Sequence, residues 1–385
     1  MTAPKLTDYY CSQKFWWLSV DLGKFQTFSC CSATPQKSNI DWLKQNPGQL
    51  FNTPELIDDR QSMIDNHAVS SCKDNCWIPE SQGLPSRRVN MNSQDRTHLE
   101  VVSNPEVLNI VVGSDCNMTC VYCCKTYSSA WLRDIADGKY PVTATDDRFI
   151  ITTVDRVTAS VGQKQLALAS SQQTMLDETV KLYQSPTLRE IMITGGEPFL
   201  YLNLAQLVKN IPSHIPVTVW SGLGVDETRF AKELQKLPKN ITVVISAENI
   251  ESAYEFVRYG NSWKRFNTNL AQLKSQGIAY KFNSTVSNLT APGLQEFVDW
   301  AEDASINFQL CNDPDFLSVS VLDNNTKKLL RSKLTNVPDF VLEALDHTPT
   351  DQQIHNFKSY VKEFGRRRSL TTAVFPKTLA DWIEQ

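Results

Sequence analysis

The sequence lacks the features that would place the chain in a membrane or on nucleic acid. It has no apolar run of about 18 residues, the length that a membrane-spanning helix needs. Its first eight residues lack the apolar stretch of a secretory signal peptide. Neither sign of charge dominates, since the formal net charge is −4, and no repeat or low-complexity segment is present. We therefore expect a cytoplasmic protein with neither a membrane nor a nucleic-acid partner.

Cysteine, in contrast, is abundant. The 385 residues include 10 cysteines, and a chain of this length is expected to form about two domains. Cytoplasmic thiols stay reduced, so many cysteines in such a chain point to metal or redox chemistry rather than to structural disulfides.

Three of these cysteines, Cys116, Cys120 and Cys123, form a C-x3-C-x2-C motif. The apolar run at 108–112 predicts a buried strand just before them, which places the motif at a strand's carboxyl end, where α/β proteins bind ligands. Three thiolates on one short loop can hold three irons of a [4Fe–4S] cluster and leave the fourth iron to a small molecule. A zinc loop is the alternative, but zinc ribbons carry paired C-x2-C motifs instead.

A second motif, Gly195-Gly196-Glu197-Pro198, follows a predicted strand at 190–194. Two glycines let the backbone approach a ligand closely. The carboxylate of Glu197 can accept hydrogen bonds from an ammonium group. By itself such a tetrapeptide is usually an ordinary turn, so its position after the cysteine motif gives it meaning.

Together, the two motifs resemble the signature of the radical S-adenosylmethionine (radical SAM) superfamily, as does Tyr122 before the third cysteine. The resemblance implies a [4Fe–4S] cluster bound to SAM, with the Gly-Gly-Glu-Pro motif holding the methionine amino group and Tyr122 shaping the adenine pocket. It also implies reductive cleavage of SAM to a 5′-deoxyadenosyl radical, which abstracts a hydrogen atom from a substrate. A flavodoxin- or ferredoxin-type protein would supply the electron.

The fold class expected is α/β. Helix-separated strands are predicted at 108–113, 190–194, 217–222, 242–248, 280–286 and 306–311. Alternating strands and helices indicate parallel pairing with right-handed crossovers. With the resemblance, this predicts a partial (β/α)6 TIM-like barrel over residues 106–311, followed by a helical extension over 312–385.

Strand ends supply further candidates for SAM contacts. Ser221 ends the third strand, and Ser246 and Glu248 end the fourth. In related enzymes such a Ser-x-Glu contacts the ribose or the methionine carboxylate region of SAM, although a helix N-cap or a solvated loop is the plain alternative. Arg258 could bind the SAM carboxylate through two hydrogen bonds, and a surface salt bridge is the alternative.

The N-terminal residues 1–90 resemble the SPASM or twitch modules that hold auxiliary iron–sulfur clusters in this superfamily. A β-hairpin is predicted over 9–31, with its turn at 21–23, and helices over 41–46 and 54–65. The resemblance implies a second [4Fe–4S] cluster on four cysteines, namely Cys11, Cys30, Cys72 and Cys76. Cys31 is an alternative to Cys30, and structural zinc is an alternative to the cluster. The module usually follows the barrel, whereas here it precedes it.

Cys311, which ends the sixth strand, is a candidate catalytic residue. A thiol at the barrel mouth could return a hydrogen atom to a substrate radical, as in epimerases of the superfamily. A buried packing role is the commoner fate of a lone cysteine, and Cys124 is a competing donor. We expect a peptide or protein substrate; the alternatives are a small molecule (a sugar, nucleotide or amino acid) and, outside enzymes, an iron–sulfur electron carrier.

Overall fold

The computed structural model describes residues 8–30, 33–81, 86–93, 100–137, 163–202, 204–238 and 240–385. Cys31, the alternative ligand to Cys30, lies outside these residues. Among the described helices, none combines the length and the apolar character needed to cross a membrane.

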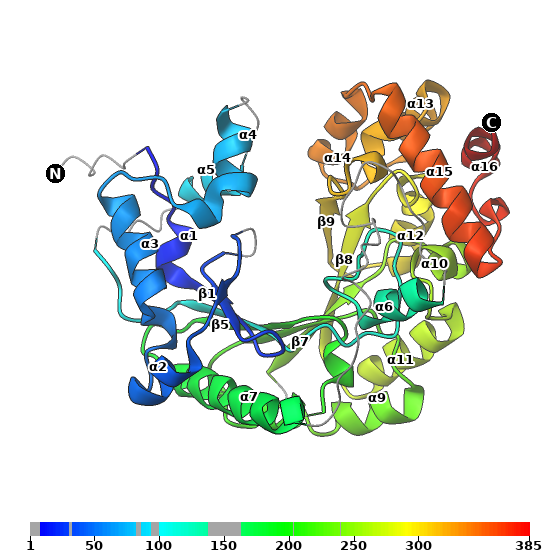
Figure 1. The fold of residues 1–385 in the computed structure, drawn as a ribbon. Coiled ribbons are helices and arrows are strands. Elements are labelled where there is room, and N and C mark those ends of the chain that lie inside the picture. Colours follow the sequence, from blue (N-terminus) through cyan, green and yellow to red (C-terminus); the bar gives the residue numbers. More distant parts are fainter. Residues whose placement is uncertain are drawn as a thin grey trace.

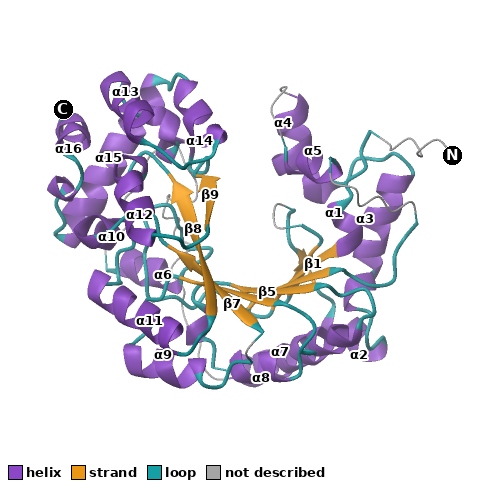
Figure 2. Ribbon diagram, turned by 180° about the vertical axis from the view of Figure 1, so that it is seen from behind, coloured by secondary structure: helices purple, strands orange, loops and turns teal. Residues whose placement is uncertain are grey.

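The centre of the fold is one nine-stranded sheet with the order β3-β2-β1-β4-β5-β6-β7-β8-β9 (Figures 1 and 2). Strand β1 and strands β4 to β9 run parallel, whereas β2 and β3 are antiparallel to their neighbours. Because β3 and β9 occupy the two edges, the sheet does not close, and the predicted partial barrel is confirmed. The strands are β1 Trp17–Asp21, β2 Gln26–Phe28, β3 Gln36–Lys37, β4 Val107–Val111, β5 Glu190–Thr194, β6 Val217–Ser221, β7 Ile241–Ser246, β8 Ala279–Val286 and β9 Ile306–Leu310.

The N-terminal hairpin belongs to this same sheet. Strand β1 pairs with β4 along its whole length, from Trp17 opposite Val107 to Asp21 opposite Val111. The barrel sheet therefore continues into the segment that the sequence suggested as a separate module. The division into domains at 1–90, 106–311 and 312–385 stays a prediction.

Helices α7, α9 and α11 lie along the convex side of the curved sheet, whereas α4 and α5 stand on its concave side at the N-terminal arm (Figure 1). The predicted helices at 41–46 and 54–65 are confirmed as α2 and α3. The helices are α1 Gln13–Trp16, α2 Ile40–Gln45, α3 Pro54–Ile64, α4 Ile78–Ser81, α5 Arg87–Asn92, α6 Ser129–Ala136, α7 Gln163–Lys181, α8 Leu204–Lys209, α9 Glu227–Leu234, α10 Glu251–Val257, α11 Trp263–Ser275, α12 Leu294–Ala301, α13 Asn324–Lys333, α14 Asp339–Glu343, α15 Asp351–Arg368 and α16 Lys377–Glu384.

The two faces of the sheet differ in polarity. On the convex face, alternate residues such as Ile191, Ile193 and Val219 are fully buried in the main hydrophobic core. On the concave face the intervening residues are partly exposed in β5 and β6, and Asn307 and Gln309 of β9 are exposed. A parallel sheet is usually apolar on both faces. Here the open barrel leaves one polar face to line a site.

Candidate functional site

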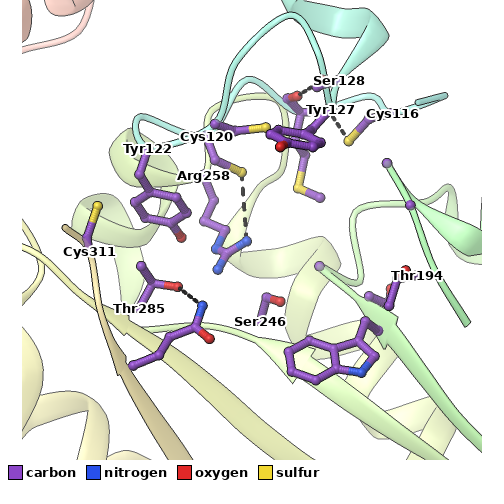
Figure 3. A pocket seen from close by; sticks show the side chains of 18 of the residues that line it. Cys116, Cys120, Tyr122, Tyr127, Ser128, Thr194, Ser246, Arg258, Thr285 and Cys311 are labelled. Carbon is purple, nitrogen blue, oxygen red and sulfur yellow. Dashed lines mark hydrogen bonds between the residues drawn. The ribbon is translucent and has the colours of Figure 1, made fainter. Parts of the chain in front are cut away.

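The C-x3-C-x2-C loop runs directly from the carboxyl end of β4 into a cavity of about 560 Å³. All three motif cysteines line this cavity, which is bounded by the carboxyl ends of the parallel strands (Figure 3). In Figure 3, Cys116 and Thr194 lie on one side, and Cys311 and Thr285 lie on the other. The other lining residues include Met118, Tyr122, Tyr127, Gly195, Gly196, Trp220, Ser221, Gly222, Ser246, Arg258 and Gln309.

Glycines let the neighbouring loops press against the cysteine loop. A Cβ atom on Gly196 would lie 2.4 Å from the carbonyl oxygen of Asp115, and one on Gly222 would lie 2.3 Å from the Cε of Met118. The backbone N–H of Gly196 donates to the Gly113 carbonyl at 2.9 Å. The Gly-Gly-Glu-Pro motif therefore packs directly on the cysteine loop, because only glycine leaves room for this close approach.

Two further contacts hold the middle of the loop. The Val121 N–H donates to the Val257 carbonyl at 2.9 Å, and the Val121 carbonyl accepts from the Tyr360 hydroxyl at 2.7 Å. Tyr360 lies on α15 of the C-terminal extension and is fully buried. The extension thus fixes the peptide between Cys120 and Cys123, a role that sequence reasoning missed because the two segments are 239 residues apart.

The three thiols lie next to one another, with Cys116 and Cys120 buried and Cys123 half-buried. Burial, together with the neighbouring Cys120 and Glu197, raises the pKa of Cys116 to about 12. Burial raises the pKa of Cys123 well above its ordinary value, with Cys120, Cys124 and Cys116 adding to the effect. Such crowded thiols ionise readily only when positive metal ions bind them. This donor set fits three irons of a cluster.

Glu197 is buried immediately behind the cavity wall. Its Oε1 accepts from the Ser221 hydroxyl at 2.8 Å and from the Phe199 N–H at 3.2 Å, and its Oε2 accepts from the Gly222 N–H at 3.0 Å. Burial raises the pKa of Glu197 to about 7, although these three donors oppose the shift. A nearby cation would keep the carboxylate ionised at neutral pH. Pro198 is also buried, but it starts a short 3-10 helix and does not line the cavity.

Arg258, Glu248 and Tyr122 form a buried network below Cys120. Arg258 donates from Nε and Nη2 to the two carboxylate oxygens of Glu248 at 2.9 and 2.8 Å. Its Nη1 lies 3.8 Å from the Cys120 Sγ, and the Tyr122 hydroxyl also donates to Glu248. Although burial disfavours the charged guanidinium, Glu248 beside it raises the pKa of Arg258. The network thus places a permanent positive charge at the cluster loop.

The predicted SAM-site residues differ in their access to the cavity. Ser221, Ser246 and Arg258 line it. Glu248 is fully buried behind Arg258, which occupies both of its oxygens. Sequence reasoning missed Trp220, which also lines the cavity. The alternation along strand β6 could have identified it, because the even-numbered residues of this strand face the concave side of the sheet.

Two other cysteines near the site also differ in their access to the cavity. Cys311 follows β9 directly, is 4 % exposed and lines the cavity. Its backbone N–H donates to the Val286 carbonyl at 2.8 Å, which holds it at the strand end. Cys124 is buried in the main hydrophobic core and does not line the cavity.

The four N-terminal cysteines form a second group of thiols, near the amino end of β1. Burial, together with the neighbouring Cys30 and Cys72, raises the pKa of Cys11 to about 12. Burial also raises the pKa of Cys76, and Cys30 contributes to that shift. In the described part of the chain, no three His, Cys, Asp or Glu side chains are grouped to hold one metal ion. Four cysteine thiolates are the donor set that a [4Fe–4S] cluster takes.

Comparisons with known proteins agree with the cysteine motif. Residues 110–301 match the family model described as the Radical SAM superfamily. No curated protein matches the chain.

Solved structures with similar features were also found. Tagged anSMEcpe with bound AdoMet has 16% identity and a TM-score of 0.38, over 59% of this chain and 57% of that one. Streptococcus suis SuiB bound to its precursor peptide SuiA has 16% identity and a TM-score of 0.36, over 69% of this chain and 55% of that one. SuiB bound to S-adenosylmethionine has 13% identity and a TM-score of 0.35, over 93% of this chain and 74% of that one. The alignments to anSMEcpe and to the SuiB–SuiA complex thus span little more than half of those chains.

Proposed function

This chain belongs to the radical SAM superfamily, and on that premise we propose that it uses SAM to generate a radical that abstracts hydrogen from a peptide or protein substrate. One observation carries the proposal: the three motif thiols and the Arg258 guanidinium line a single cavity at the carboxyl ends of the strands, and the Glu197 carboxylate lies directly behind its wall. The cluster, when bound, supplies the electron that cleaves the SAM sulfonium.

In this proposal the residues of the chain bind and orient the cluster and SAM. Cys116, Cys120 and Cys123 hold three irons. Glu197 accepts hydrogen bonds from the methionine ammonium through the opening at Gly195 and Gly196, and the ammonium keeps it ionised. Ser246 and the free face of the Arg258 guanidinium are candidates for the ribose and the SAM carboxylate. In this arrangement Glu248 and Tyr122 act by holding Arg258 in place, and Tyr122 also shapes the adenine pocket.

The polar concave face supports an extended substrate. SAM itself would take up much of the 560 Å³ cavity, so most of the substrate must lie outside it. Two exposed amides of β9 lie at this cavity. Asn307 donates to Asn283 of β8 at 2.7 Å, and Gln309, which lines the cavity, donates to Thr285 of β8 at 3.3 Å. Side-chain amides of this kind can pair with peptide groups. A small-molecule substrate is the second candidate, because the volume alone falls within the range of small-ligand pockets.

We further propose that Cys11, Cys30, Cys72 and Cys76 hold an auxiliary [4Fe–4S] cluster. Such a cluster could accept an electron from the substrate radical, relay electrons or stabilise the N-terminal segment. A zinc ion on the same thiols is the alternative. The electron donor is proposed to be a flavodoxin- or ferredoxin-type protein, which fits a cytoplasmic setting.

The central proposal is tested by SAM cleavage after anaerobic reconstitution with iron, sulfide, SAM and dithionite. The variant Cys116→Ala/Cys120→Ala/Cys123→Ala should produce no 5′-deoxyadenosine, because the cluster loses all its ligands. Cys124→Ala is the matched control, since it changes the adjacent thiol in the core and should retain cleavage. Cleavage by the triple variant would show that the assignment is wrong.

A further inference from the structure

Lys14 is a buried lysine in the N-terminal segment that the proposed SAM chemistry does not use. It is fully buried in helix α1. Its Nζ donates to the Asp59 Oδ2 at 2.6 Å and to the Ser71 Oγ at 2.9 Å, and the Ser71 hydroxyl in turn donates to Asp59 at 2.9 Å. A buried ammonium is costly even when it is paired. Its position therefore calls for a reason.

That position is next to the four thiols. Ser71, an acceptor of the Lys14 ammonium, directly precedes Cys72. The backbone N–H of Lys14 also donates to the Cys11 carbonyl at 3.2 Å. At Cys72, after burial, the positive charge of Lys14 is the largest influence, and the opposing effect of Asp59 is the smallest. Lys14 and Asp59 both contact Ser71, so the two charges of the pair lie beside the peptide that carries Cys72.

We propose that Lys14 is a positioning residue that sets the reduction potential of the auxiliary cluster. The inference rests on the proposed cluster at Cys11, Cys30, Cys72 and Cys76. Four thiolates carry more negative charge than the iron–sulfur core offsets, and reduction adds another electron. A fixed positive charge nearby stabilises the reduced form and raises the potential, since net charge and hydrogen bonds to sulfur are main determinants of cluster potentials.

The two members of the pair should act with opposite sign. Lys14→Met removes the positive charge and should make the auxiliary cluster harder to reduce. Asp59→Asn removes the negative charge, keeps a side chain of the same size and should make the cluster easier to reduce. If the pair served only to hold the fold, both substitutions would weaken cluster retention in the same direction, and neither would shift the potential in a sign-dependent manner.

The experiment is an anaerobic redox titration of the reconstituted full chain, followed by electron paramagnetic resonance of the auxiliary cluster. Cys116→Ala/Cys120→Ala/Cys123→Ala serves as the background, so that only the auxiliary signal is read. The midpoint should become more negative in Lys14→Met and more positive in Asp59→Asn. In Lys14→Met/Asp59→Asn, which removes both charges, the two shifts should offset each other and the midpoint should return toward that of the background. Equal midpoints, or shifts of one sign in both single variants, would overturn the inference.

Two measurements keep the outcomes separate. If Lys14→Met does not retain iron, Asp59→Asn should still raise the midpoint, and removing Lys14 as well in the double variant should cancel that rise. If the background protein itself binds no second cluster, the proposed auxiliary site fails and the inference fails with it. If the cluster is present and its midpoint does not move, only the role of Lys14 is rejected.

Discussion

At the scale of single residues, the site depends on charged groups that are buried but not neutralised by a fixed partner. Glu197 accepts three hydrogen bonds from neutral groups, and burial raises its pKa to about 7. Arg258, by comparison, has its charge balanced by Glu248. Glu197 is therefore the group whose ionisation a cationic ligand would change.

SAM binding should consequently weaken as pH falls. With a pKa of about 7 for Glu197, and binding only to the ionised form, the Kd for SAM should be roughly tenfold higher at pH 6 than at pH 8. The sign follows because protonation removes the acceptor for the methionine ammonium. Equilibrium dialysis of reconstituted protein with SAM measures this.

The matched variants are Glu197→Gln and Glu178→Gln. Glu197→Gln should bind SAM weakly and show no such pH dependence. Glu178 is also a buried glutamate, 3 % exposed, but it accepts from the Gly48 N–H away from the cavity. Glu178→Gln should keep the wild-type profile. A pH-independent Kd in the wild type would contradict the role of Glu197.

Cys311 carries the second residue-scale prediction. Because it lines the cavity, its thiol can reach a radical formed there. If it is the hydrogen donor, Cys311→Ala should still cleave SAM but lose product, and the wild type should incorporate one deuterium from deuterated water into the substrate. Mass spectrometry of the product reads both. Full product formation by Cys311→Ala would leave the thiol a packing role.

At the scale of elements, helix α15 supports the cluster loop from the other end of the chain. The Tyr360 hydroxyl donates to the Val121 carbonyl, and Arg368 pairs with Asp134 of α6 at 2.6 Å. Helix α15 ends in a short basic run at 366–368, within which Arg368 is buried and contacts the Trp131 and Phe364 rings. A helix that the sequence indicated as an extension thus packs against the cysteine loop and helps to hold it in place.

Tyr360→Phe should loosen the cluster loop without unfolding the protein. Loss of one buried hydrogen bond costs about 1 kcal/mol of unfolding free energy. Tyr183→Phe is the control, because its hydroxyl donates to the Leu207 carbonyl at 2.9 Å in the core. Both variants should lose similar stability in urea titrations, but only Tyr360→Phe should release iron faster from the SAM-site cluster under a chelator. Equal iron release from both would show that α15 does not stabilise the loop.

At the scale of the whole molecule, the two groups of thiols lie at opposite ends of the adjacent parallel strands β1 and β4. The SAM-motif cysteines follow the carboxyl end of β4, and the N-terminal cysteines lie near the amino end of the adjacent β1. A single sheet connects the two groups. The turn of the N-terminal hairpin contacts the loop that follows β4, since a Cβ on Gly23 would lie 3.0 Å from the Gly113 Cα.

Iron counting tests this arrangement. The protein isolated anaerobically should carry about eight irons per chain, four from each cluster. Cys72→Ala/Cys76→Ala should lower the count to about four while 5′-deoxyadenosine is still formed, because the SAM motif is intact. Stoichiometric zinc with only four irons would replace the auxiliary cluster by a structural metal.

Local patterns were sufficient for much of this protein. All six barrel strands and the helices at 41–46 and 54–65 were predictable, because strand and helix periodicities depend on neighbouring residues. The cysteine loop and Gly195–Pro198 could be placed at strand ends for the same reason. Parallel pairing then brings strand ends together, which is why Ser221, Ser246 and Cys311 line one cavity with the three cysteines.

Contacts between distant segments were decided only by the tertiary structure. The sequence determined that the hairpin would form, but not that β1 would pair with β4 about 90 residues later and extend the barrel sheet. It indicated that Glu248 would end a strand and that Arg258 would follow in the next helix, but not that the two would bind each other. It contained no sign that Tyr360 would reach Val121 or that Lys14 would be buried beside four thiols. These contacts depend on packing between elements that are distant in the sequence and share no local pattern. They form only when the sheet and its helices assemble.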